Sequence, residues 1–207
     1  MNWELHERNY WKYYLKLEHE FLDIMDYIEL VPENYAVYSI KLMQLLLSIG
    51  SEFEAVLKEI CSTTEKSRTS MMDYAPVIFR RYPKLLLQKI CVVNKSITLA
   101  PFAGWNLEQP AKSLEFWNAY NDVKHHRTER YSKASFGAVL NALAALFTLN
   151  MYRLHEIYMS CDNLPRSVPE EESRLFYPEN WTRHIRTSVL KFPYRVYDDD
   201  AHEEFVF

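Results

Sequence analysis

The segment FWNAYNDVKHHRTERY, residues 116–131, places amide, imidazole and cationic side chains directly behind an aromatic stretch. The residues in it whose types could do chemistry are Asn121, Lys124, His125, His126 and Arg127. An imidazole gains and loses a proton near neutral pH, so a histidine here can act as a general acid or base. Neighbouring cations can bind a phosphate and stabilise negative charge that develops on it. These residue types fit acid–base chemistry on a phosphate ester without a metal.

Helical spacing would bring these side chains together at one helix end, because each residue of an α-helix turns the direction by about 100°. The apolar face of this helix would consist of Phe116, Ala119, Tyr120 and Val123. Offsets of three, four and seven residues gather a neighbouring polar stripe of Asn121, Lys124, His125 and Thr128. Arg130 and Lys133 extend it as a basic rim. The other interpretation is a solvated helix C-terminus, where cations are favoured by the helix dipole.

The elements that must position this stretch are expected to be helices. Only 3 Gly against 15 Tyr, 11 Phe and 5 Trp argues against an all-β chain with many tight turns. Hydrophobic periodicity predicts helices over about 3–28, 35–61, 71–81, 114–128 and 133–158. Gly50 inside the second helix indicates close packing, a kink or a break. Two β-branched runs around Asn94 and Lys95 predict a small β-hairpin near 88–102.

The domain organisation follows from length and composition. A chain of 207 residues with 48% apolar residues can bury one sizeable core, so residues 1–165 are predicted to form a single all-α antiparallel helical bundle carrying the hairpin. Residues 166–207 are predicted to be an irregular C-terminal wrap with an acidic tail. Residues 134–152 carry no charge, yet their polar interruptions and helical spacing favour a central buried helix over a membrane span.

Charge and cysteine usage exclude several classes of protein. A net charge of -4 gives no global attraction to nucleic acid or an anionic membrane, so any such binding must be local. Cys61, Cys91 and Cys161 have no CxxC spacing, and a reducing cytoplasm fits them best. The charged N-terminus does not fit a signal peptide. No HExxH, paired CxxC or glycine-rich phosphate loop occurs, so neither a metal nor another cofactor is expected.

The segment YNDVKH, residues 120–125, resembles the motif of the HEPN superfamily of small α-helical domains. In that motif an arginine, usually followed by a polar residue, precedes a histidine near the end of a helix. Asn121 matches the polar position and His125 the histidine, whereas Tyr120 stands at the arginine position. The order of elements over 35–158 is similar as well: two long antiparallel helices, a variable insertion, the motif helix and a long apolar helix.

The resemblance implies a function for the motif helix. HEPN enzymes are metal-independent ribonucleases of toxin, antiphage and RNA-processing systems that dimerise with both motifs at one cleft; other members are non-catalytic. The chain is therefore expected to be an endoribonuclease or RNA-binding component of a bacterial defence or toxin system, a homodimer, with RNA and an antitoxin-like protein as partners. The alternative, favoured by Tyr120, is an inactive helical interaction module that docks a protein or a nucleotide.

Within that resemblance each candidate residue has an expected role. His125 is the acid or base, and Lys124 and Arg127 bind the phosphate in place of the missing arginine. The expected contacts to the RNA backbone are Lys124, His126, Arg127, Arg130 and Lys133. Asn121 either orients His125 or pairs with it to close the bundle. The second helix faces the motif in such an arrangement, so Ser51, Glu52 or Glu54 is expected to orient His125, with Tyr120 in support.

Overall fold

The computed structural model describes residues 3–62, 70–160, 169, 171–179, 181–183 and 194–196. The α-helices are α1 Trp3–His6, α2 Lys12–Met25, α3 Ile40–Ser62, α4 Met71–Arg81, α5 Glu115–His125, α6 Arg127–Arg130 and α7 Phe136–Met159. A π-helical turn, η1 Glu7–Trp11, joins α1 to α2, and three 3-10 turns are η2 Pro32–Asn34, η3 Leu85–Leu87 and η4 Tyr131–Lys133. The strands are β1 Ile90–Val92, β2 Thr98–Leu99, β3 Phe176–Pro178, β4 Trp181–Arg183 and β5 Tyr194–Val196.

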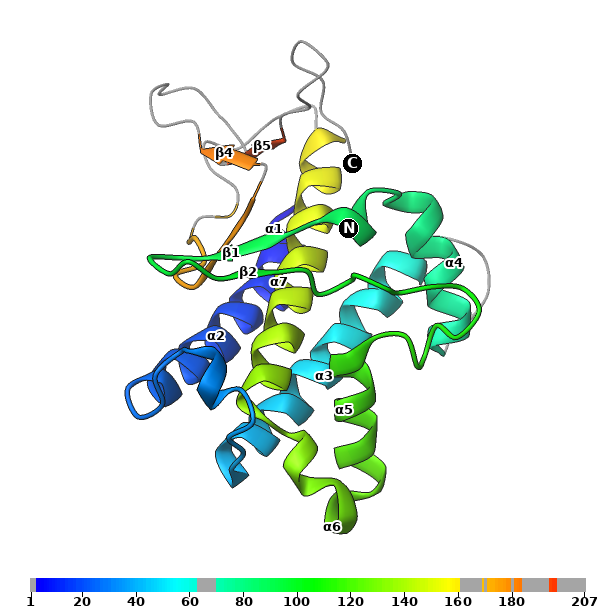
Figure 1. Cartoon of the computed structure of the whole chain (residues 1–207). Coiled ribbons are helices and arrows are strands. Elements are labelled where there is room, and N and C mark those ends of the chain that lie inside the picture. Colours follow the sequence, from blue (N-terminus) through cyan, green and yellow to red (C-terminus); the bar gives the residue numbers. More distant parts are fainter. Residues whose placement is uncertain are drawn as a thin grey trace.

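Helix α7 forms the centre of the molecule, and α2, α3 and α5 pack around it (Figure 1). Every residue from 142 to 155 is buried, as an apolar helix surrounded by other helices requires. The prediction of a central buried helix is therefore confirmed. None of the helices in the described ranges is long and apolar enough to cross a membrane.

Consecutive long helices run in opposite directions, while α3 and α7 run in the same direction. Tyr35 lies just before α3 and contacts Gly137 at the start of α7, and Glu59 near the end of α3 pairs with Arg153 near the end of α7. Lys41 of α3 reaches Glu20 near the end of α2, which fixes these two helices as antiparallel. The fold is thus mostly helical, in agreement with the predicted bundle.

Helix boundaries depart from the sequence-based expectation where the backbone has another partner. The second long helix begins at Ile40 rather than near residue 35, because Tyr38 forms an isolated antiparallel bridge with Ser135. The carbonyl of Val37 also accepts a hydrogen bond from the amide of Phe136 at 2.7 Å. The first helix is interrupted by the π-helical turn and ends at Met25.

The predicted hairpin forms, and it gains a third strand from the C-terminal part of the chain. Strands β1 and β2 pair antiparallel, with Asn94 at the turn in a left-handed conformation of φ 58°. Strand β3 pairs with the other edge of β1, giving the order β2-β1-β3, and β4 pairs with β5. The expectation of an irregular segment over 166–207 is therefore wrong for residues 176–178, 181–183 and 194–196. The acidic tail lies outside the described residues.

Candidate functional site

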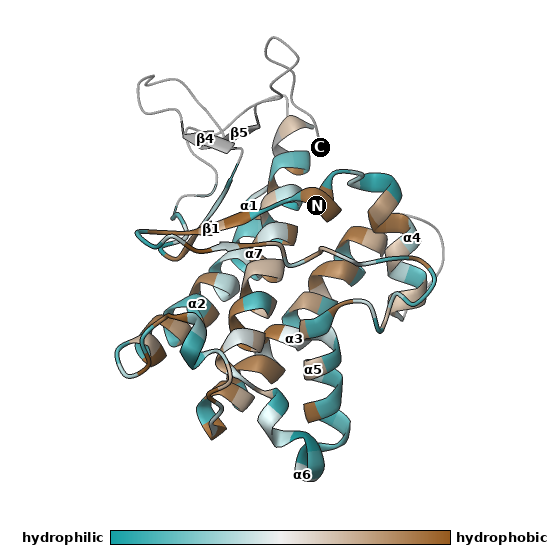
Figure 2. Cartoon of the chain, in the orientation of Figure 1, coloured by the Kyte–Doolittle hydropathy of each residue, from teal (hydrophilic) through white to brown (hydrophobic). Residues whose placement is uncertain are grey.

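The polar stretch singled out in the sequence forms an exposed end of the molecule. We call residues 124–133 the basic tip; they comprise the last residues of α5, then α6 and η4. His126, with φ -130° and ψ 39°, ends α5 and starts the short α6, so the chain turns sharply here. Figure 2 shows hydrophilic residues gathered at this end of α5 and over α6. Every residue from Lys124 to Arg130 is exposed.

The apolar face of α5 lies as the spacing predicts, with its five buried side chains Phe116, Trp117, Ala119, Tyr120 and Val123. The ring of Tyr120 lies directly against Gly50 of α3, where an added Cβ would be 2.2 Å from Tyr120 Cδ2. Gly50 therefore permits close helix packing, which was one of three interpretations of that glycine. Tyr120 is a core residue whose ring also lies 5.1 Å from the ammonium of Lys124. A hydrogen bond with Tyr120 raises the pKa of Lys124 above its usual value.

The side chains of the motif residues Asn121 and His125 are not joined by a hydrogen bond. Asn121 Nδ2 donates instead to the carbonyl of Trp117, 3.0 Å away on the preceding turn of α5. His125 is exposed, and its side chain makes no hydrogen bond with the described part of the chain. Its imidazole is therefore accessible from solvent, and no side chain of the described residues fixes its orientation.

The acidic residues expected to support His125 have other surroundings. Glu54 pairs with Lys58 at 3.1 Å, although its charge also helps to raise the pKa of Lys124. Glu52 is buried, and its charge helps to raise the pKa of Tyr10 in the π-helical turn. Ser51 is exposed. The structure thus gathers Lys124, His125, His126 and Arg127 at the basic tip, and it does not connect Glu52 or Glu54 to His125 by a hydrogen bond.

The basic tip contains four cations and one carboxylate, that of Glu129. The four cations are Lys124, Arg127, Arg130 and Lys133. None of them forms an ion pair with another described residue. Elsewhere such pairs are common and involve Lys16, Lys41, Lys58, Arg81, Lys89, Lys95 and Arg153. The tip is therefore a local surface of uncompensated positive charge on a chain whose net charge is -4.

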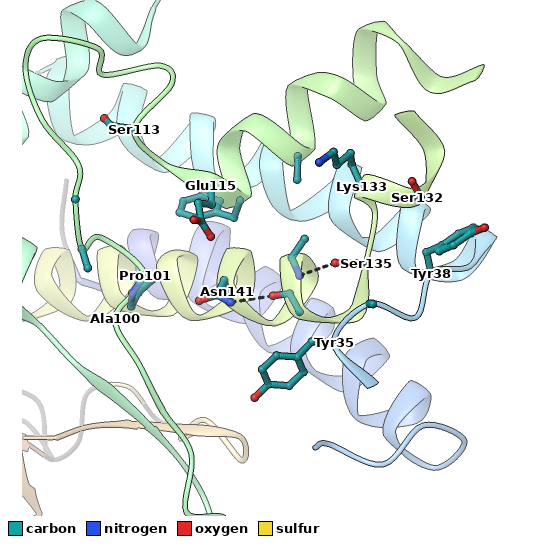
Figure 3. Close-up of a pocket in the computed structure, with 17 residues that line it drawn as sticks. Tyr35, Tyr38, Ala100, Pro101, Ser113, Glu115, Ser132, Lys133, Ser135 and Asn141 are labelled. Atoms are coloured by element: carbon teal, nitrogen blue, oxygen red, sulfur yellow. Dashed lines mark hydrogen bonds between the residues drawn. The ribbon is translucent and has the colours of Figure 1, made fainter. Parts of the chain in front are cut away.

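A groove of about 800 Å³ opens beside the basic tip. It lies between the start of α7, the first half of α5, the loop of residues 100–113 and the stretch Tyr35–Tyr38 (Figure 3). Lys133 lines it, whereas His125 and the other residues of the basic tip that sequence analysis selected do not. Sequence analysis missed this groove because it is built from four separate segments.

A buried polar cluster is the second feature that sequence analysis missed. Arg153 of α7 donates from Nε and Nη2 to the two carboxylate oxygens of Glu59 at 2.8 and 2.7 Å. His6 Nε2 donates a hydrogen bond to Asn150 Oδ1 at 3.1 Å, and its ring stacks on Tyr10. Burial, together with the charge of Arg153, lowers the pKa of His6 to about 3. Glu52 lies near this cluster, and burial raises its pKa to about 7.

The described residues contain no group of three or more His, Cys, Asp or Glu side chains placed to hold a metal ion. No family model, no curated protein and no solved structure matches the chain. The chemistry of the basic tip and of the groove therefore has to be argued from their own residues.

Proposed function

We propose that the protein binds RNA through the basic tip. The observation that carries this proposal is that four neighbouring cations at one exposed end of the molecule all lack a carboxylate partner among the described residues, whereas cations such as Lys41 and Lys58 are paired. A cation that is already exposed and unpaired loses little on meeting a phosphate, and it releases counterions from the nucleic acid. The resemblance of residues 120–125 to the HEPN motif supports RNA as the anionic partner.

Cleavage of the bound RNA is the second candidate function, and the exposed imidazole of His125 favours it. A metal-free mechanism needs a base for the 2′-hydroxyl proton and cations for charge that develops on the phosphate. His125 would supply the base, while Lys124 and Arg127 would bind the phosphate. Asn121 already donates to Trp117, so the orientation of His125 would come from the RNA or from a second copy of the chain. A homodimer with two facing tips would meet that need.

Binding is tested by fluorescence anisotropy with a labelled single-stranded RNA at several salt concentrations. Replacing Arg127 and Arg130 together by glutamine should weaken binding and lower the slope of log K against log salt by about 0.7 for each lost phosphate contact. Lys89→Gln is the matched control, because Lys89 is an exposed lysine that lies next to β1 and is paired with Glu179. Equal loss in the control, or no binding by the wild type, would contradict the proposal and favour a helical module that docks a protein or a nucleotide.

Cleavage is tested with the same RNA in EDTA. We expect His125→Ala to lower the rate by about 10²-fold or more at an unchanged melting temperature, because an exposed acid–base group contributes to rate and little to packing. His126→Ala, the adjacent exposed imidazole, serves as the control. Light scattering should give about twice the chain mass of 24.8 kDa. Intact RNA after long incubation would exclude cleavage and leave the binding proposal standing.

A further inference from the structure

The groove beside the basic tip offers two unpaired charges of opposite sign. Lys133 and Glu115 both line it, both are exposed, and neither forms an ion pair with any described residue. In Figure 3, Lys133 lies with Ser132 and Tyr38 at one end, and Glu115 lies toward the other. A ligand that satisfies both ends must therefore carry negative charge at one end and hydrogen-bond donors at the other.

The remaining lining adds two tyrosines and a hydrogen-bond acceptor. Tyr35 and Tyr38 both line the groove, and Tyr38 makes an edge contact with Tyr131 of η4 at 5.4 Å between ring centroids. Asn141 lies on α7 between the two ends, and its Nδ2 donates to the carbonyl of Gly137 at 2.9 Å. That bond leaves Asn141 Oδ1 to accept a hydrogen bond from a ligand.

Small residues form part of the lining of the groove. They are Gly137 and Ala138 of α7 and Ala119 of α5, and the space beside Gly137 is filled by Tyr35. At Gly137 an added Cβ would be 3.0 Å from Tyr35 Cβ, so a larger side chain would push this tyrosine. The volume of about 800 Å³ lies within the range of roughly 300–1,000 Å³ that small-molecule sites occupy.

We propose that this groove takes one nucleotide of the single-stranded RNA that the basic tip binds, with guanine as the preferred base; this inference rests on the proposed function. The phosphate lies at Lys133, because the carboxylate of Glu115 would repel it. The base stacks on a tyrosine ring, which is how proteins bind unpaired bases. Guanine carries adjacent N–H donors at N1 and N2, which match the two oxygens of the Glu115 carboxylate.

Lys133 makes the groove continuous with the basic tip. It belongs to η4, directly after the two arginines of the tip, and its side chain lines the groove. A strand whose phosphates follow Arg127 and Arg130 therefore arrives at the end of the groove that carries the positive charge. The tip supplies affinity without regard to sequence, and the groove supplies the choice of base.

The test compares three labelled eight-nucleotide RNAs, each a uridine strand with uridine, guanosine or inosine at the fourth position. Anisotropy should show the guanosine strand binding about tenfold more tightly than all-uridine, as expected for a bidentate contact to a base. Inosine, which lacks the N2 amino group, should bind with intermediate affinity. Glu115→Gln should bring the ratio of guanosine-strand affinity to all-uridine affinity from about ten to near one.

Glu108→Gln is the matched control, because Glu108 is an exposed carboxylate in the loop that precedes α5 and does not line the groove. This variant should keep the guanosine preference. A wild type that binds all three RNAs equally, while the Arg127 and Arg130 replacements still weaken binding, would overturn the proposal that the groove selects guanine. That result would leave the proposed function intact. Binding of none of the RNAs would overturn both.

Discussion

Single buried residues set the pH dependence of this protein. Glu52 is 9% exposed, and its Oε1 has no hydrogen-bond partner among the described residues. Burial raises its pKa from 4.5 to about 7, because the charged form is separated from water. The folded state therefore holds the Glu52 proton more tightly than the unfolded state. Its contribution to stability is complete below about pH 4.5 and is lost as the pH rises toward 7.

Replacing Glu52 by glutamine should remove this pH dependence. Between pH 5 and pH 8 the wild type should lose up to about 3 kcal/mol of unfolding free energy through this group, at about 1.4 kcal/mol for each unit of pKa shift. The Glu52→Gln variant should match the wild type within about 1 kcal/mol at pH 5 and be more stable at pH 8. Urea unfolding at the two pH values measures both. Glu54→Gln, on the same helix but paired with Lys58, should leave the wild-type dependence in place.

At the scale of elements, periodicity predicted what each helix buries. The buried face of α5 agrees with the sequence-based expectation because it depends on local spacing alone. The bounds of α4 agree as well, because the proline after Tyr82 ends that helix. Gly50 is more informative. The sequence indicated close packing, a kink or a break, and only the position of the Tyr120 ring decides between them.

Contacts between distant segments explain what the sequence could not predict. Glu59 and Arg153 are 94 positions apart, and no spacing rule relates residues of two different helices. Helix α3 begins at Ile40, later than the sequence predicts, because Tyr38 pairs with Ser135 just before α7. The candidate site divides in the same way. The exposed cations of the basic tip are local in sequence and were predicted together, whereas the groove needs four segments to form.

At the scale of the whole molecule, one buried carboxylate fastens the C-terminal part of the chain to the helices. Glu18 of α2 is 2% exposed and accepts hydrogen bonds from the backbone amides of Arg174 and Leu175 at 2.9 and 3.3 Å. It also accepts from the hydroxyls of Tyr14 and Ser173. Strand β3 begins at Phe176, directly after this anchor, and completes the sheet on β1. The anchor and the third strand are therefore expected to form together.

Replacing Glu18 by alanine should destabilise the protein by about 3 kcal/mol, because it leaves the buried amide of Leu175, the part-buried amide of Arg174 and two hydroxyls without their acceptor. Urea unfolding followed by circular dichroism measures the loss. Glu20→Ala is the matched control: Glu20 lies two residues on in α2, where it forms surface pairs with Lys16 and Lys41, and its loss should cost about 1 kcal/mol or less. Limited proteolysis should also cut the Glu18→Ala variant faster within residues 171–179, since β3 would leave β1 more often. A Glu18→Ala variant that is as stable as the Glu20→Ala control would show that β3 holds the C-terminal segment without the carboxylate.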